Sequence, residues 1–110
     1  MELALSNEGN GASIILYSPI GKIHNFSYRL EFACTDNVTE FESLLLGIEN
    51  SYDLGCINLT FFADSKLVVN LVRKIYSPSN KLMKCYTHVF WMLISNLLSF
   101  NITHIKRELN

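Results

Sequence analysis

The sequence lacks a cysteine pattern that would support a disulfide framework or a zinc knuckle. Its three cysteines are an odd number, and no two of them have C-x-x-C spacing. No signal peptide is expected either, because the first residues contain no basic region followed by an apolar core. Together these absences indicate a reduced intracellular compartment, the cytoplasm or the nucleus.

Long apolar runs are also missing. The most apolar stretch, residues 89–100, is interrupted by Ser95, Asn96 and Ser99. Because a membrane-spanning helix needs about 20 predominantly apolar residues, we expect no membrane span. The sequence shows no internal repeat and no long linker. Its 110 residues, 49% of them hydrophobic, are therefore expected to form a single domain over residues 1–110.

Acidic residues are absent from one long stretch. Residues 65–107 contain seven Lys or Arg residues and no acid, whereas residues 31–64 contain seven acids and no Lys or Arg. This division fits a metal site beside a phosphate-binding face, although two ordinary solvated surfaces would give the same pattern. The candidates for binding nucleic-acid phosphates are Arg73, Lys74, Lys81 and Lys84. The first two alternatively stabilise the end of their own helix.

Hydrophobic periodicity predicts strands and helices in alternation. We expect strands at residues 12–17, 22–30, 57–63 and 102–105. Helices are expected from an N-cap at Thr35 or Asp36 to about residue 53, from residue 65 to about residue 74, and at residues 81–99. The Ser-Pro-Ile-Gly segment at residues 18–21 predicts the turn of a hairpin, and Gly55 predicts a left-handed helix C-cap. Strands linked by helices pair in parallel, so the expected fold class is an α/β mixed sheet that includes one antiparallel hairpin.

Two acids stand where the ends of predicted elements could meet. Glu40 lies early in its helix, at the edge of the apolar face; alternatively, it only adds favourable charge near a helix N-terminus, worth about 0.3–1 kcal/mol. Asp64 follows a parallel strand, at the sheet edge where α/β proteins bind ligands. Its alternative role is the N-cap of the helix that begins at Ser65. Two carboxylates in these places could share one divalent cation.

Four segments carry a family resemblance. They are GNGASIILYSPIGKIHNFSYRL (residues 9–30), CTDNVTEFESLLLGIE (34–49), FFADSKLVVNLV (61–72) and NITHIKRELN (101–110). In this order and spacing they resemble the ribonuclease H superfamily, most of all the ribonuclease H-like domain of plant retroelements, the reverse-transcriptase-like proteins. The resemblance implies a ribonuclease H-like mixed sheet with helices packed on it. It also implies cleavage of the RNA strand of an RNA–DNA hybrid.

The same resemblance assigns roles to individual residues. Glu40 and Asp64 match metal-binding carboxylates of a site for two Mg²⁺ (or Mn²⁺) ions, and His104 matches a catalytic histidine of a mobile loop. Glu2, in Glu2-Leu3-Ala4, is the best match to the family's first Asp, which opens an Asp-Gly-Ala-like motif. Asn110 matches the Asn that precedes the last Asp, so an incomplete metal site is expected.

The family's first strand lies in the centre of the sheet, where only residues 1–5 remain to form it. A truncated first strand is therefore expected, without the family's last helix. Either a short stub suffices, or another chain takes the place of this strand, or the chain is a damaged copy that folds poorly. Three hypotheses follow: an RNA–DNA hybrid endonuclease with impaired activity, a catalytically dead nucleic-acid-binding or protein-interaction module, and a fragment without function. The helix at residues 81–99 is apolar over more than one face, which predicts either a core helix or a surface for self-association.

Overall fold

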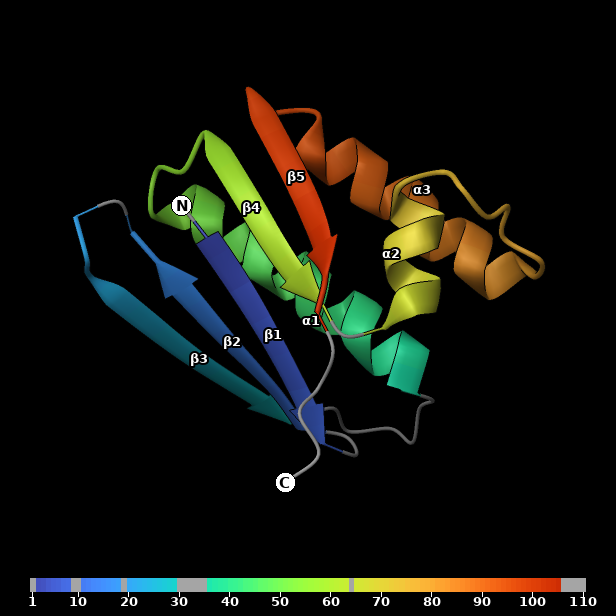
Figure 1. Cartoon of the computed structure of the whole chain (residues 1–110), viewed down its shortest axis with the longest axis horizontal. Helices are drawn as coiled ribbons and strands as arrows, with labels where there is room; N and C mark the ends of the chain where they lie inside the picture. The colour runs from blue at the N-terminus through green and yellow to red at the C-terminus, as the bar shows by residue number, and fades with distance from the viewer. Residues whose placement is uncertain (1, 9–10, 19, 30–35, 64, 106–110) are drawn as a thin grey trace.

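The computed structural model describes residues 2–8, 11–18, 20–29, 36–63 and 65–105. In this part of the chain a five-stranded sheet has the order β3-β2-β1-β4-β5, and three helices pack against it (Figure 1). The strands are β1 (Glu2–Glu8), β2 (Gly11–Tyr17), β3 (Ile23–Arg29), β4 (Asn58–Ala63) and β5 (Ser99–His104). The helices are α1 (Asp36–Asp53), α2 (Lys66–Val72) and α3 (Lys81–Ile94). The expected mixed sheet, antiparallel for β1–β3 and parallel for β1, β4 and β5, is confirmed.

The predicted hairpin is formed by β2 and β3, which pair from Gly11↔Arg29 to Tyr17↔Ile23. At its turn the N–H of Gly21 donates to the carbonyl oxygen of Ser18 over 3.0 Å. Gly21 has a φ of 84°, which glycine adopts at no steric cost. The turn chemistry read from the sequence therefore produces the observed connection.

The central strand is longer than expected. All seven residues of β1 pair with β2, and Glu2, Leu3 and Ala4 also pair with Thr60, Phe61 and Phe62 of β4. The expectation of a short stub at residues 1–5 was wrong, because residues 6–8 (Ser-Asn-Glu) have no apolar side chain to indicate a strand. Pairing with β2 needs only their backbone groups. Strand β1 is thereby paired along its whole length with β2 and at residues 2–4 with β4.

Helix α1 crosses behind the sheet in Figure 1 and packs on β1 and β2. Its inner face buries Val38, Phe41, Leu44 and Ile48, as the 3.6-residue period predicts. The helix ends in a Schellman motif: the N–H of Gly55 donates to Tyr52 O and that of Cys56 to Ser51 O, both over 2.9 Å. Gly55 has a φ of 78°, so the predicted left-handed C-cap is confirmed.

Helix α3 is shorter than expected, ending at Ile94 and not at Ser99. Beyond it, the N–H of Leu98 donates to Ile57 O over 2.7 Å, and Ser99 pairs with Asn58 as the first residue of β5. The apolar residues after Ile94 continue the helical pattern in the sequence. In the structure, residues from Ser99 onward pair with β4 and form a strand instead. Strand β5 accordingly begins three residues before the expected residue 102.

One aromatic cluster lies between α3 and the sheet. Phe61 of β4 and Phe90 of α3 are fully buried, with ring centroids 6.0 Å apart, and Phe100 of β5 lies 5.9 Å from Phe90. Helix α3 is also tied to α1, because the Tyr52 hydroxyl donates to Leu93 O. None of the described helices is long and apolar enough to cross a membrane.

Candidate metal and nucleic-acid site

Glu40 lies at the edge of the sheet where it was expected. Its side chain is only 2% exposed, and its Oε1 accepts a hydrogen bond from the backbone N–H of Ser65 over 3.3 Å. Because Ala63 is the last residue of β4, this bond places the Glu40 carboxylate at the carboxyl end of that strand. The alternative of a charge near its own helix N-terminus does not account for this position, since the carboxylate contacts the start of α2.

Burial gives this carboxylate a defined orientation. An ionised carboxylate loses its hydration in the interior, and this is tolerated when hydrogen bonds or a cation replace the lost water. The N–H of Ser65 supplies one such bond. The Ser65 hydroxyl donates to Oδ1 of Asn37 over 2.9 Å, so a second contact joins the start of α1 to the start of α2. These two bonds therefore join the start of α1 to the start of α2 beside the carboxyl end of β4.

Asp64 itself lies outside the described residues. In the sequence it stands between Ala63, which ends β4, and Ser65, whose N–H contacts Glu40. Its alternative role as a helix N-cap is wrong, because the N-cap of α2 is Ser65, whose Oγ accepts from the N–H of Val68 over 3.2 Å. Capping therefore gives no reason for an acid at position 64.

His104 lies at the same edge of the sheet. It is the last residue of β5 and pairs with Ala63, while the N–H of Ile105 donates to Ala63 O over 2.9 Å. The resemblance matched this residue to a histidine in a loop, but here the backbone of His104 belongs to a strand. Its partly buried imidazole accordingly has a more constrained position than a loop would give it.

Glu2 has a less favourable place. It pairs with Thr60, three residues before Ala63 on β4, which corresponds to about 10 Å along the strand at about 3.3 Å per residue. The side chain of Glu2 lies outside the described part of the structure. Its backbone position gives no support to the assignment of Glu2 as a ligand beside Glu40.

Among the described side chains, no group of three or more His, Cys, Asp and Glu could hold a metal ion. This finding does not include Asp64 or the side chain of Glu2, because both lie outside that set. The described acid at the carboxyl end of β4 is Glu40. A cation bound there would need further oxygen ligands. Asp64, which directly follows the last residue of β4 in the sequence, is the acid expected to supply them.

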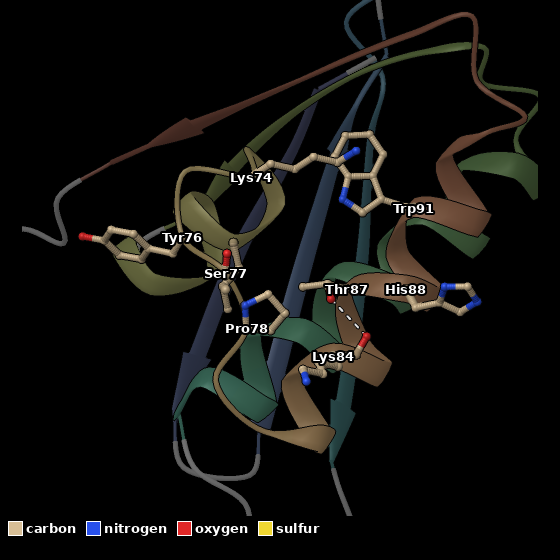
Figure 2. A pocket seen from close by; sticks show the side chains of 9 residues that line it. Lys74, Tyr76, Ser77, Pro78, Lys84, Thr87, His88 and Trp91 are labelled. Atoms are coloured by element: carbon tan, nitrogen blue, oxygen red, sulfur yellow. Dashed lines mark hydrogen bonds between the residues drawn. The ribbon is translucent and has the colours of Figure 1, made fainter.

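The four basic candidates do not form one surface. Arg73 ties the end of α2 to β5, because its Nη2 donates to Ile102 O over 2.5 Å. Lys81 is exposed at the first turn of α3. Lys74 and Lys84, in contrast, line the same pocket of about 500 Å³ between the end of α2, the following loop and α3 (Figure 2). The structure therefore brings together two of the four.

The pocket also contains residues that the sequence analysis did not connect with the lysines. Nζ of Lys74 lies 4.3 Å from the centroid of the Trp91 ring, and His88 and Trp91 line the pocket beside Lys84. The sequence does indicate part of this set, because residues 84, 88 and 91 have the spacing of one helix face. No sequence period connects them with Lys74, which precedes the loop.

A second pocket, of about 320 Å³, adjoins the sheet edge at Glu40. It lies between the starts of α1, α2 and α3, and its polar lining includes Asn37, Ser79 and Asn80. Asn37 is the residue bonded to Ser65, so this pocket opens beside the candidate metal site. Its lining is neutral, in contrast to that of the basic pocket, with which it shares Leu71 and Ser77.

Comparison with known proteins agrees with this architecture. A family model described as "Reverse transcriptase-like" matches residues 4–110, a segment that begins after Glu2. The structure of RNase H1 from the halophilic archaeon Halobacterium salinarum NRC-1 superimposes with a TM-score of 0.85 at 19% identity, covering 97% of this chain and 87% of that one.

Two further structures are similar. The N-terminal RNase H domain of a Mycobacterium tuberculosis protein, solved as a fusion with maltose-binding protein, gives a TM-score of 0.83 at 18% identity, with 97% and 88% coverage. LC11-RNase H1 in complex with an RNA/DNA hybrid gives 0.84 at 19% identity, with 96% and 85% coverage. No curated protein matches the chain. These likenesses show that the fold is that of ribonuclease H.

Proposed function

The chain belongs to the reverse transcriptase-like family and has the ribonuclease H fold, and from this premise we propose that it binds RNA–DNA hybrids and cleaves the RNA strand with a divalent cation. The observation that carries the proposal is the buried carboxylate of Glu40 at the carboxyl end of β4, bonded to Ser65. LC11-RNase H1, which shares the fold, has been solved with an RNA/DNA hybrid. That complex supports a hybrid as the ligand.

Glu40 and Asp64 would hold the cation, and carboxylate oxygens suit Mg²⁺ or Mn²⁺. In a two-ion site, one cation would activate a water molecule and the other would stabilise the leaving oxygen of the phosphodiester. The chain's own contribution is orientation: the Ser65 N–H and the packing of α1 fix the direction of the Glu40 carboxylate. His104, the last residue of the adjacent strand β5, would accept or release a proton.

The test is cleavage of a labelled RNA–DNA hybrid in Mg²⁺ and in Mn²⁺. We expect cleavage of the RNA strand, and a loss of at least about 100-fold in Asp64→Asn, since even an outer-shell change at a metal site costs about 10–100-fold. Glu49→Gln is the control, because Glu49 is exposed on α1. Cleavage that survives in Asp64→Asn would refute the role assigned to Asp64.

The second candidate is a catalytically dead domain that binds nucleic acid without cleaving it. The observation that favours it is the register of β1, which places Glu2 three residues short of the end of β4. In that case a hybrid binds with the same Kd in EDTA and in Mg²⁺, and no cleavage follows. Turnover in Mg²⁺ that EDTA abolishes would exclude this candidate.

An intracellular location, in the cytoplasm or nucleus, belongs to the same proposal. Cys56 and Cys85 are free thiols, which fits a reducing compartment. Fluorescence microscopy of the tagged chain tests this location.

A further inference from the structure

We propose that the pocket at the end of α2 binds a nucleotide of an unpaired strand, so that single-stranded nucleic acid beyond a hybrid is held there. This inference extends the proposed function to a second contact with nucleic acid. Three residues carry it: Lys74, Lys84 and Trp91. They lie between the C-terminal end of α2 and one face of α3, as Figure 2 shows.

The charge of the pocket selects an anion. Lys74 and Lys84 are the two lysines of its lining, and no acid lines it. Residues 65–107 contain no Asp or Glu at all, so no carboxylate from α2, α3 or their connecting loop competes for the two ammonium groups. A phosphate held by either ammonium group would therefore meet no carboxylate of the pocket lining.

The aromatic side of the pocket selects a planar group. Phe90 and Phe100 contact the Trp91 ring edge-on, at centroid distances of 5.8 and 5.4 Å, and thereby fix its orientation. Nζ of Lys74 lies 4.3 Å from the ring centroid, and both residues line the pocket. A phosphate that draws this ammonium aside would open the ring face to a base. Stacking of bases on aromatic rings is a common mode of single-strand binding.

The backbone of Lys74 supports a role beyond stability. Lys74 has a φ of 63°, the left-handed conformation that favours glycine. It occupies the C′ position of a Schellman motif, because its N–H donates to Leu71 O over 3.1 Å and that of Ile75 donates to Asn70 O over 2.9 Å. A lysine at a position suited to glycine is an unfavourable choice for the fold, and such choices cluster at ligand sites.

The pocket is separate from the candidate metal site. Ser65, which contacts Glu40, caps the N-terminal end of α2, whereas Lys74 follows its C-terminal end. A helix of seven residues is about 10 Å long. A strand that leaves a hybrid at the metal site could therefore reach the pocket, but the two sites do not share a residue. Binding in the pocket can be measured without cleavage.

Trp91 provides a direct probe, because it is the one tryptophan of the chain. Single-stranded DNA of ten thymidines, titrated in EDTA, should quench its fluorescence in a saturable manner. An abasic strand of equal length should bind about five- to 150-fold more weakly, which corresponds to the loss of stacking by one base. AMP, which has the same chemistry without a strand, should bind more weakly than the ten-mer.

Variants separate the pocket from general electrostatics. Lys74→Gln and Lys84→Gln should each weaken strand binding and reduce the slope of log Kd against log salt by about 1. Both side chains are exposed, so circular dichroism should show an intact fold. Lys22→Gln is the control with an equal charge change, because Lys22 is exposed at the β2–β3 turn, outside the pocket.

Three results would overturn the inference. They are the absence of saturable quenching, an abasic strand that binds as tightly as the ten-mer, and an equal loss of binding in Lys22→Gln and Lys74→Gln. Binding of AMP as tight as that of the ten-mer would overturn the assignment of a strand in favour of a free nucleotide. Because the titration contains EDTA, a failure of cleavage at Glu40 and Asp64 does not alter its result.

Discussion

Replacement of Glu40 by glutamine separates a metal ligand from a structural residue. Glutamine has almost the same shape, and its Oε1 can still accept the hydrogen bond from the Ser65 N–H. The side chain is 2% exposed, so the change exchanges one buried polar side chain for another of nearly the same size. Since neutral replacements at such sites are often harmless to stability, we expect the free energy of unfolding in EDTA to change by less than about 1 kcal/mol.

The same substitution should abolish stabilisation by Mg²⁺. A ligand that binds only the folded state stabilises it by about 2.7 kcal/mol at 100 times its Kd, equivalent to a rise in Tm of about 10 °C in a domain of this size. Glu40→Gln should lose most of this rise, and cleavage of a hybrid should fall at least about 100-fold. Glu49→Gln, exposed on the same helix, should retain both.

The assay is thermal unfolding monitored by circular dichroism, with and without Mg²⁺. Glu40→Ala is the contrasting variant: it leaves the Ser65 N–H without this acceptor and creates a cavity, so we expect a loss of about 2–4 kcal/mol in EDTA. Two results would refute the reasoning. One is an equal Mg²⁺ response in wild type and Glu40→Gln, and the other is a wild type whose Tm does not respond to Mg²⁺.

Three further predictions concern other parts of the chain. Lys74→Gly should be more stable than Lys74→Ala by about 1 kcal/mol in urea unfolding, because glycine relieves the left-handed backbone; equal stabilities would contradict the assigned strain. Burial raises the pKa of Tyr52 above 10, so its contribution to stability is present below pH 10 and is lost as pH rises through the raised pKa; urea unfolding of Tyr52→Phe should lack this alkaline decrease. Self-association through α3 would use its exposed Leu82, Val89 and Met92; Val89→Lys should then shift the sedimentation coefficient to that of a monomer, and an already monomeric wild type would refute it.

Much of the fold could be predicted because its signals are local. The Ser-Pro-Ile-Gly turn, the left-handed cap at Gly55 and the apolar face of α1 each depend on neighbouring residues, and the structure contains all three. The incorrect predictions concern segments that form a strand only because they pair with another strand distant in the sequence. Residues 6–8 form a strand because β2 pairs with them, and residues 99–101 join β5 because β4 does.

The candidate site divides in the same way. Spacing placed Glu40 near the edge of a helix face and Asp64 after a strand, but it could not show that the Glu40 carboxylate contacts Ser65, the residue after Asp64. The sequence also suggested one group of four basic residues. In the structure Arg73 is bonded to β5, while Lys74 and Lys84 line one pocket. Charge alone does not indicate which side chains the fold uses for its own contacts.

The amino-acid sequence by itself determined the identity of most helices and strands, the C-terminal end of α1 and the residue types available for oxygen ligands, because backbone preferences and side-chain periodicity act over a few residues. Only the tertiary structure decided the length of β1, the burial of Glu40 against the start of α2, and the meeting of Lys74 with Trp91. These features depend on strand register and helix packing, which bring together residues that local preferences cannot connect.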